Sequence, residues 1–271
     1  MTETAAPYLQ GGSSAVLISI PHSGQGLCTG LRERLSPGAA LLPDTDWFVD
    51  RLYAQATALG AGILLAPMSR YVVDLNRPPD DAPLYNRSET SLLTGLVPLS
   101  TFAGQAIYQP GDEPGGHEIC QRIEAYWRPY HECLQAELRR LVALWGYAVL
   151  LDAHSIRSTL PLLFEGRLAD FNLGSNGGRS ASQSLIHVAT HALRGAAYSL
   201  VIDGRFKGGY ITRAYGQSAA NVHVLQLEMA QSAYMQEVPP AWVERQARPV
   251  QVVLTRLINA LLDWKPPLDH A

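Results

Sequence analysis

The chain has 271 residues, of which 47% are hydrophobic, so it contains enough apolar material for a full-sized core. Its formal net charge is −3, and the sequence contains no run of Lys and Arg. This balance removes the usual electrostatic basis for binding nucleic acid or an anionic membrane surface, and we expect neither as a partner.

The N-terminus carries acids and glycines where a secretory signal would have a basic flank and a long apolar stretch. We therefore predict no signal peptide and no membrane-spanning helix, and we expect a cytoplasmic protein. No low-complexity linker interrupts the chain. We expect a single domain over residues 1–271, with flexible tails at 1–14 and 265–271.

The predicted elements alternate between strands and helices. Short segments that are apolar or alternate in polarity predict strands at 16–20, 62–67, 71–75, 148–152, 160–164, 198–202 and 222–227. Helical spacing of apolar residues predicts helices at 44–59, 117–145, 182–193 and 241–264, the second of them kinked at Pro129. This order indicates an α/β fold with a mixed, mostly parallel central sheet that helices cover on both faces.

Two histidines stand where apolar strands end. His22 follows the strand 16–20 and His154 follows the strand 148–152, and a serine comes directly after each of them. In open α/β sheets the ligand crevice lies beyond the carboxyl ends of the strands, so the two rings are expected to converge on one site. Imidazole is the commonest metal ligand, so the pair favours a metal centre, although a lone histidine at a strand end is more often structural.

A catalytic zinc needs a third protein ligand and an open position for water. Asp46 is the candidate, because it would lie in the first turn of the helix that follows the His22 loop. Acidic residues at helix starts are also ordinary capping residues; Asp44 is the better N-cap and therefore the weaker ligand candidate. Asp152, two positions before His154, shares its face of the strand and is a candidate to orient that ring.

Glu228 follows the apolar strand 222–227. A carboxylate at this place is a candidate general base, which would take a proton from water and return it to a leaving amine. The alternative is a salt-bridged residue at the start of a helix.

Arginines at loop positions indicate an anionic small molecule as the partner. Asn76 and Arg77 follow an apolar segment and offer an amide beside a planar fork that suits a carboxylate. The Gly-rich segment 204–213 adds Arg205 and Arg213 in a protein that is otherwise mildly acidic. A substrate with more than one carboxylate would match this charge, whereas the alternative is a solvated basic loop.

The ordered motifs of the chain resemble those of the N-formylglutamate amidohydrolase family, from about residue 16 to about residue 235. The resemblance rests on Pro21-His22-Ser23-Gly24, Asp44-Thr45-Asp46-Trp47, Ser69-Arg70-Tyr71, Asp74-Leu75-Asn76-Arg77-Pro78, Trp127-Arg128-Pro129-Tyr130-His131, Asp152-Ala153-His154-Ser155-Ile156-Arg157, Leu163-Phe164-Glu165-Gly166, Gly204-Arg205-Phe206-Lys207-Gly208-Gly209, Thr212-Arg213 and Leu225-Gln226-Leu227-Glu228. That family is similar to the zinc carboxypeptidases and aspartoacylases, so the resemblance implies a three-layer α/β/α, phosphorylase/hydrolase-like fold.

The resemblance implies a single catalytic domain that releases formate from N-formyl-L-glutamate, the last step of one bacterial route of histidine degradation. It implies a Zn²⁺ cofactor, or another divalent metal. We expect His22 and His154 as ligands, with Asp46 as the inferred third ligand. Glu228 would activate the water, and Arg70 would stabilise the negative charge that develops on the formyl oxygen.

Some positions depart from the related patterns. In the carboxypeptidases a Glu ligand follows the first zinc histidine by three positions; Gln25 stands there in this chain, so Asp46 as a ligand is inferred. The family's usual Asn before Gly-Arg-Phe-Lys is Asp203, and its usual His in Thr-Arg-His-Tyr-Gly is Ala214. These departures leave open another N-acyl amino acid or a small peptide as the substrate. A non-catalytic protein that binds an acidic amino acid is a further alternative.

Overall fold

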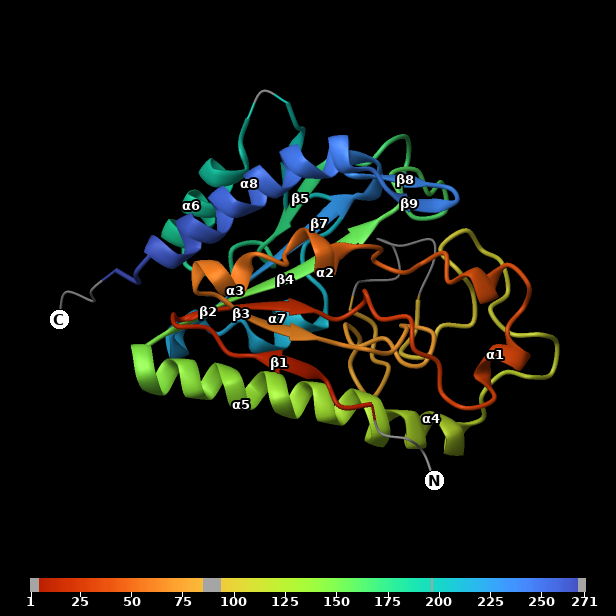
Figure 1. Cartoon of the computed structure of the whole chain (residues 1–271). Helices are drawn as coiled ribbons and strands as arrows, with labels where there is room; N and C mark the ends of the chain where they lie inside the picture. The colour runs from red at the N-terminus through yellow and green to blue at the C-terminus, as the bar shows by residue number, and fades with distance from the viewer. Residues whose placement is uncertain (1–4, 85–93, 196, 268–271) are drawn as a thin grey trace.

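A mixed seven-stranded sheet forms the centre of the molecule in the computed structural model, which describes residues 5–84, 94–195 and 197–267 (Figure 1). Its strand order is β1-β3-β2-β4-β7-β5-β6. The strands are β1 (Tyr8–Gln10), β2 (Val16–Ile20), β3 (Gly62–Leu65), β4 (Ala148–Ile156), β5 (Phe171–Gly174), β6 (Leu200–Ile202) and β7 (Val222–Ala230). A separate hairpin joins β8 (Met235–Glu237) to β9 (Pro240–Trp242).

The middle of the sheet is parallel. Strands β3, β2, β4 and β7 run in one direction, so their carboxyl ends meet at one edge of the molecule. The outer strand β1 pairs antiparallel with β3, and β5 pairs antiparallel with β7. The predicted mixed, mostly parallel sheet is therefore confirmed.

Helices cover both faces of the sheet. The helical segments are α1 (Leu31–Arg34), η1 (Ala39–Leu41), α2 (Val49–Leu52), α3 (Ala56–Leu59), α4 (Gly116–Arg122), η2 (Ile123–Trp127), α5 (Arg128–Trp145), α6 (Gln183–Leu193), α7 (Tyr210–Tyr215), η3 (Ser218–Ala220), η4 (Gln231–Ala233) and α8 (Glu244–Asp263). In Figure 1, α6 and α8 lie on one side of the sheet and α5 on the other. The predicted three-layer α/β/α architecture is confirmed.

Alternation along the strands divides the core in two. In β2, Ile18 packs with α2, α6 and α8, whereas its neighbour Leu17 packs with α5 and α7 on the other face. Successive side chains of a strand point to opposite faces, and both faces of this strand are buried. A fully apolar segment such as 16–20 is the expected pattern for such a strand.

Two predicted strands are wrong, because segments 71–75 and 160–164 form turns and loops. The first of them is nevertheless buried. In a strand, main-chain carbonyls accept hydrogen bonds from a neighbouring strand. Here two of them accept from a side chain instead: Nη1 of Arg122 lies 3.2 Å from Tyr71 O and 3.1 Å from Val72 O. The apolar pattern of segment 71–75 therefore predicts its burial correctly but not its backbone conformation.

The predicted helix 44–59 is also wrong in its first half. Phe48 adopts φ 61°, in the left-handed region, which a right-handed helix does not contain. Only the single-turn helices α2 and α3 follow it. Asp46 therefore lies in a loop, and Asp44 does not cap a helix.

The other predicted helices are confirmed with changed ends. The 117–145 helix runs from α4 to α5 through the π-helical segment η2, which ends two residues before Pro129, where the backbone ladder lacks a donor. Ser182 caps α6, and α8 begins at Glu244 because the preceding residues form β9. The predicted N-terminal tail includes the edge strand β1. Among the described residues, no helix is long and apolar enough to cross a membrane.

Candidate active site

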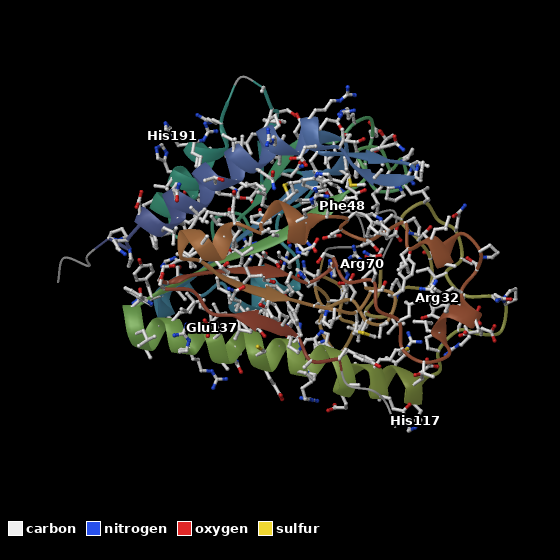
Figure 2. All side chains as sticks on the ribbon, in the orientation of Figure 1. Arg32, Phe48, Arg70, His117, Glu137 and His191 are labelled. Carbon is white, nitrogen blue, oxygen red and sulfur yellow. The ribbon has the colours of Figure 1, made fainter. Side chains whose placement is uncertain are left out.

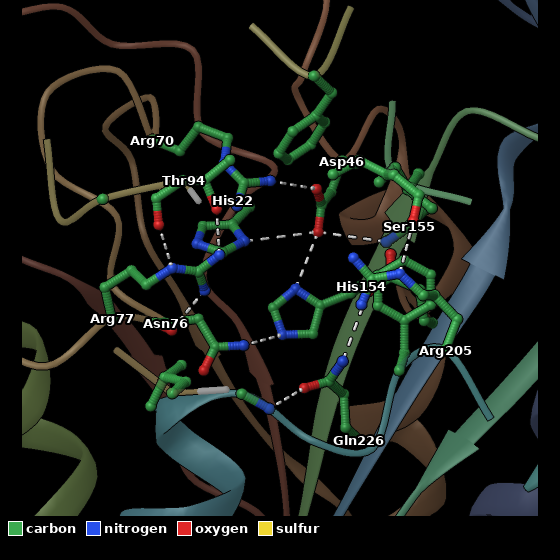
Figure 3. Close-up of a pocket in the computed structure, with 18 of the residues that line it drawn as sticks. His22, Asp46, Arg70, Asn76, Arg77, Thr94, His154, Ser155, Arg205 and Gln226 are labelled. Atoms are coloured by element: carbon green, nitrogen blue, oxygen red, sulfur yellow. Dashed lines mark hydrogen bonds and ion pairs between the residues drawn. The ribbon is translucent and has the colours of Figure 1, made fainter. Parts of the chain in front are cut away.

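Most of the sequence candidates converge on one cavity of about 350 Å³ beyond the carboxyl ends of the parallel strands. His22 follows β2 by two residues, and His154 and Glu228 are each the third residue from the carboxyl end of β4 and of β7. Asp46 reaches the cavity from the loop before α2, and its amide donates to His22 O at 3.1 Å. Figure 3 shows both histidine rings directed toward the Asp46 carboxylate.

The two histidines approach Asp46 through the same ring atom. His154 Nδ1 lies 3.0 Å from Asp46 Oδ2, and His22 Nδ1 lies 3.8 Å from the same oxygen. One ligand atom from each of these residues lies within 4.8 Å of the others, and all three side chains are buried. Two imidazoles and one carboxylate are a donor set that can hold a divalent metal ion and match the ligands of known catalytic zinc sites, which keep a fourth position for water.

His22 Nδ1 supplies an independent test of whether these residues fit a metal. It is buried and has no hydrogen-bond partner among the described residues. The other ring nitrogen, Nε2, lies 2.9 Å from Asp74 Oδ1 and holds the proton there, so Nδ1 presents its lone pair toward Asp46. A buried acceptor without a donor is costly, and a cation at this point would satisfy it.

A second carboxylate stands behind each histidine. Asp74 contacts His22 Nε2, and Asp152 Oδ2 lies 3.0 Å from His154 Nε2. Carboxylates in this position fix the ring orientation of metal-binding histidines. Asp152 is held in turn by Ser19 Oγ, which donates to its Oδ1 at 3.0 Å. The contact predicted for Asp152 is present, whereas Asp74 was not a sequence candidate.

The charges around the rings shift their pKa values in opposite directions. Burial and the Arg70 guanidinium lower the pKa of His22. Burial also opposes charge on His154, but the carboxylates of Asp152 and Asp46 outweigh it and raise the pKa of that ring well above its ordinary value. In the metal-free protein, His154 is therefore an imidazolium that links two carboxylates, and a cation at Nδ1 would have to displace its proton.

Glu228 is positioned by strand pairing. It is the register partner of His154 on the neighbouring parallel strand, and its carboxylate lines the same cavity. Gln226 Nε2 lies 3.5 Å from Glu228 Oε2. Burial, with a smaller contribution from the nearby Asp46 carboxylate, raises the pKa of Glu228 to about 8, although His154 and Arg70 oppose the shift. Such a group can hold a proton near neutral pH, as a general acid–base residue must.

Arg70 is buried at the cavity wall, and Figure 2 shows it among the loops beyond the strand ends. Its Nη2 donates to Asp74 Oδ2 at 2.7 Å, and its Nη1 lies 3.6 Å from Asp46 Oδ1. The guanidinium also lies over the Phe102 ring, 4.6 Å from its centroid. Arg70 thus presents a fixed positive charge beside the histidine group.

Two further arginines line the cavity without a described carboxylate partner. Arg77 donates from Nε to Thr94 O at 2.7 Å and from Nη1 to Asn76 O at 2.9 Å. Arg205 donates from Nε to Leu163 O at 2.7 Å. Within the described part of the chain, all the hydrogen bonds of these two guanidiniums go to uncharged acceptors. These two guanidiniums therefore offer positive charge that an anionic ligand would neutralise, in a lining that also contains the carboxylates of Asp46 and Asp81.

Other sequence candidates lie elsewhere or are already engaged. Arg213 is not among the cavity-lining residues, and its Nε donates to Gly208 O at 2.9 Å. Asn76 lines the cavity, but its amide is committed to protein groups: Nδ2 donates to Asp152 Oδ2 at 3.4 Å, and Oδ1 accepts from Ile211 N at 2.8 Å. The structure thus shows Asn76 as a link between the site and α7.

Asp44 and the two departures from the family pattern do not line the cavity. Asp44 Oδ2 accepts from the hydroxyl of Tyr71 at 2.8 Å and from the amide of Phe102 at 3.0 Å, so it is a buried loop anchor. Asp203 adopts φ 47°, a conformation that Asn and Asp tolerate, and accepts from the amide of Ser175 at 2.7 Å. Ala214 lies on α7.

The fold and cavity define the chain as an α/β protein with a candidate metal centre and acid–base carboxylate beyond the ends of its parallel strands. The chain belongs to the N-formylglutamate amidohydrolase family, whose model matches residues 14–235. The predicted family resemblance is therefore confirmed.

Similar proteins cover nearly the whole chain. N-formylglutamate deformylase from Pseudomonas putida is 47% identical over 255 residues, which are 93% of this chain and 94% of that protein. The protein of the same name from Pseudomonas aeruginosa is also 47% identical, over 256 residues and the same shares of both chains. The crystal structure of N-formylglutamate amidohydrolase from Ralstonia eutropha JMP134 superimposes with a TM-score of 0.82 at 25% identity, covering 95% of this chain and 98% of that one. A structure from Agrobacterium tumefaciens, at 18% identity and a TM-score of 0.69 over 94% of each chain, shares the fold.

Proposed function

We propose that this protein is a metal-dependent amidohydrolase that hydrolyses N-formyl-L-glutamate to formate and L-glutamate. The relatives named N-formylglutamate deformylase are 47% identical across 93% of the chain, which supports the same reaction here. This reaction would be the last step of a bacterial route of histidine degradation, carried out by one catalytic domain in the cytoplasm.

The proposed metal ligands are His22 Nδ1, His154 Nδ1 and the Asp46 carboxylate. The buried His22 Nδ1 without a described partner supports this assignment, as do the carboxylates of Asp74 and Asp152 that orient the two rings. A Zn²⁺ ion, or another divalent cation, would polarise the formyl carbonyl and lower the pKa of water at this site.

Glu228 is the proposed general base. It takes a proton from the water whose oxygen forms a bond to the formyl carbon, and it returns a proton to the nitrogen as the carbon–nitrogen bond breaks. The products are formate and the free amine of glutamate. Its place beside His154 on the neighbouring strand and its raised pKa of about 8 support this role. Arg70, fixed by Asp74, is the proposed donor to the oxygen on which negative charge develops.

One observation carries the choice of a dicarboxylate substrate: the described contacts of Arg77 and Arg205 leave both guanidiniums in the cavity without a carboxylate partner. We propose that these two arginines bind the two carboxylates of the glutamyl part. Arg213 and the Asn76 amide, which were also sequence candidates, have weaker support, because the first does not line the cavity and the second contacts protein groups.

A substrate panel tests this proposal. Formate release is compared for N-formyl-L-glutamate, N-formyl-L-glutamine and N-formyl-L-norvaline, and amine release is measured for N-acetyl-L-glutamate. We expect the highest kcat/KM for N-formyl-L-glutamate, with a loss of at least about tenfold when the side-chain carboxylate is removed, because a charged hydrogen-bond partner is lost. Equal turnover of the formyl compounds would contradict the dicarboxylate assignment, and faster turnover of the acetyl compound would contradict formate release as the reaction.

A further inference from the structure

The segment that follows β7 contacts the main chain on both sides of Asp46. Gln231 Nε2 donates to Thr45 O at 2.9 Å. The hydroxyl of Tyr234 lies 2.7 Å from Trp47 O. The two carbonyls that flank the proposed metal-binding carboxylate therefore accept hydrogen bonds from the same short segment, which is far from them in the sequence.

The same two side chains also reach the other proposed ligand strand. The Tyr234 hydroxyl lies 2.8 Å from Ser155 Oγ, and Gln231 Nε2 lies 3.4 Å from that oxygen. The amide of Ser155 donates to Asp46 Oδ2 at 3.2 Å. Ser155 follows His154 directly, so these contacts connect the neighbours of both ligands.

The contacts of Tyr234 and Gln231 all have these two side chains as the donors. The Tyr234 hydroxyl donates toward Trp47 O, the shorter of its two contacts, and toward Ser155 Oγ. The Gln231 amide donates to Thr45 O and toward the same Ser155 oxygen. Tyr234, Gln231 and Ser155 are each at most 2% exposed, and hydrogen bonds shielded from water in this way hold their geometry strongly.

The loop around Asp46 needs such support because its backbone is strained. Phe48, two residues after Asp46, adopts φ 61° and ψ 14°, a left-handed conformation that is unfavourable for a residue with a Cβ. Strained backbone persists only where its surroundings over-determine it. The bond from Tyr234 to Trp47 O holds the residue that directly precedes this point.

We propose that Tyr234 and Gln231 are positioning residues for the metal centre: they hold the Asp46 loop at the distance from His154 that a cation requires. This inference rests on the proposed function, since it assumes that Asp46 and His154 are ligands. It goes beyond the proposed function, because it states that two side chains outside the cavity lining strengthen the binding of the metal.

The test compares two Tyr→Phe variants. Tyr234→Phe removes the hydroxyl that contacts Trp47 O and Ser155. Tyr53→Phe is the matched control, since Tyr53 is equally buried in the same core cluster, and its hydroxyl has no partner among residues 5–84, 94–195 and 197–267. Zinc affinity is measured for both variants and the wild type by competition with a chromophoric chelator, and formate release is titrated with added zinc.

We expect Tyr234→Phe to bind zinc about tenfold more weakly, which is the lower end of the effect seen when groups that orient metal ligands are removed. Its formate release should return toward the wild-type rate at saturating zinc, whereas a general loss of folding would not be reversed by the metal. Tyr53→Phe should match the wild type in affinity. If Tyr234→Phe does not fold, Gln231→Met is used in its place, which removes only the contacts to Thr45 O and Ser155.

The outcomes separate the two proposals. Zinc affinity of Tyr234→Phe or Gln231→Met equal to that of the wild type would overturn the positioning role and leave the metal site intact. Equal weakening in Tyr53→Phe and Tyr234→Phe would also overturn it, because the effect would then come from core packing. A wild-type protein that binds no zinc would contradict the metal centre itself, and the positioning role would fall with it.

Discussion

His154 on β4 and Glu228 on β7 are register partners in adjacent parallel strands, so their side chains leave the sheet on the same face and enter the same cavity. The next pair on this face, Asp152 and Gln226, lies two residues earlier on each strand. A shift of one residue in this pairing would turn Glu228 to the opposite face of the sheet. The relation between the proposed metal ligand and the proposed base is thus fixed by backbone hydrogen bonds, before any side-chain contact is considered.

Replacing Glu228 with Gln keeps the size of the side chain but removes its capacity to take a proton. We expect kcat for formate release to fall by about 10²- to 10⁴-fold, the usual contribution of a general base. The zinc content should equal that of the wild type, because Glu228 is not a proposed ligand. The exposed Glu132→Gln on α5 is the control and should keep full activity. Loss of zinc together with activity in Glu228→Gln would show that Glu228 is a ligand instead.

Removal of either cavity guanidinium should affect substrate use before stability. We expect Arg77→Ala and Arg205→Ala each to lower kcat/KM for N-formyl-L-glutamate by about 10- to 150-fold, the range for a lost charged hydrogen bond of about 1.5–3 kcal/mol. Steady-state kinetics and thermal unfolding are measured on the same samples, with the exposed Arg179→Ala as the control. Unchanged kinetics in both cavity variants would remove the proposed carboxylate contacts.

Restoring the family's usual residues at the two departures should change little. Asp203 accepts a hydrogen bond from the Ser175 amide, Ala214 lies on α7, and neither residue lines the cavity. The double variant Asp203→Asn, Ala214→His should therefore keep kcat/KM within about twofold of the wild type, because Asn also tolerates the positive φ. A tenfold or larger gain would mean that one of these positions controls substrate choice, and a kinetic comparison on N-formyl-L-glutamate decides the matter.

His131 should make stability depend on pH. Burial lowers the pKa of His131 to about 4, while the unfolded chain titrates near 6.5, so between these values only the unfolded state takes up the proton. Above pH 6.5 the ring is neutral in both states, and its titration costs no stability. As the pH falls from 6.5 toward 4, protonation of the unfolded chain lowers the free energy of unfolding by roughly 3 kcal/mol.

Urea unfolding of the wild type and His131→Gln at pH 7.5 and pH 5 measures this contribution. We expect the variant to be less stable at pH 7.5, since it loses the stacking of the ring on Trp127, and the difference to shrink at pH 5. A difference that is the same at both pH values would rule out His131 as the titrating group.

The sequence predicts the parts of the fold in which burial and strand conformation coincide. The segment 16–20 is apolar because both faces of β2 are buried, and β4 and β7 follow the same rule. The segment 71–75 is also mostly apolar and buried, but Arg122 donates to the carbonyls of Tyr71 and Val72, and no strand forms. The apolar content of a segment cannot distinguish a strand from such a buried loop, because the donor that replaces the strand partner, Arg122, lies far away in the sequence on α4.

The site shows the same limit. His22, His154 and Glu228 can be found because each stands at the end of a strand, where the fold places a ligand crevice. Asp74 has a local signal, a charged residue inside an apolar run, but its contact with His22 depends on how a loop folds over the sheet edge. No local pattern indicates Tyr234, because its role depends only on a carbonyl that the fold brings to it.

The central claim is metal-dependent release of formate, and its most direct test is formate production from N-formyl-L-glutamate by the purified protein before and after chelation. The account predicts turnover that a chelator abolishes and that added Zn²⁺ restores, with no restoration in His22→Ala or Asp46→Ala. Turnover that persists in protein shown to be free of metal would contradict it, and so would a folded, zinc-loaded protein that releases no formate.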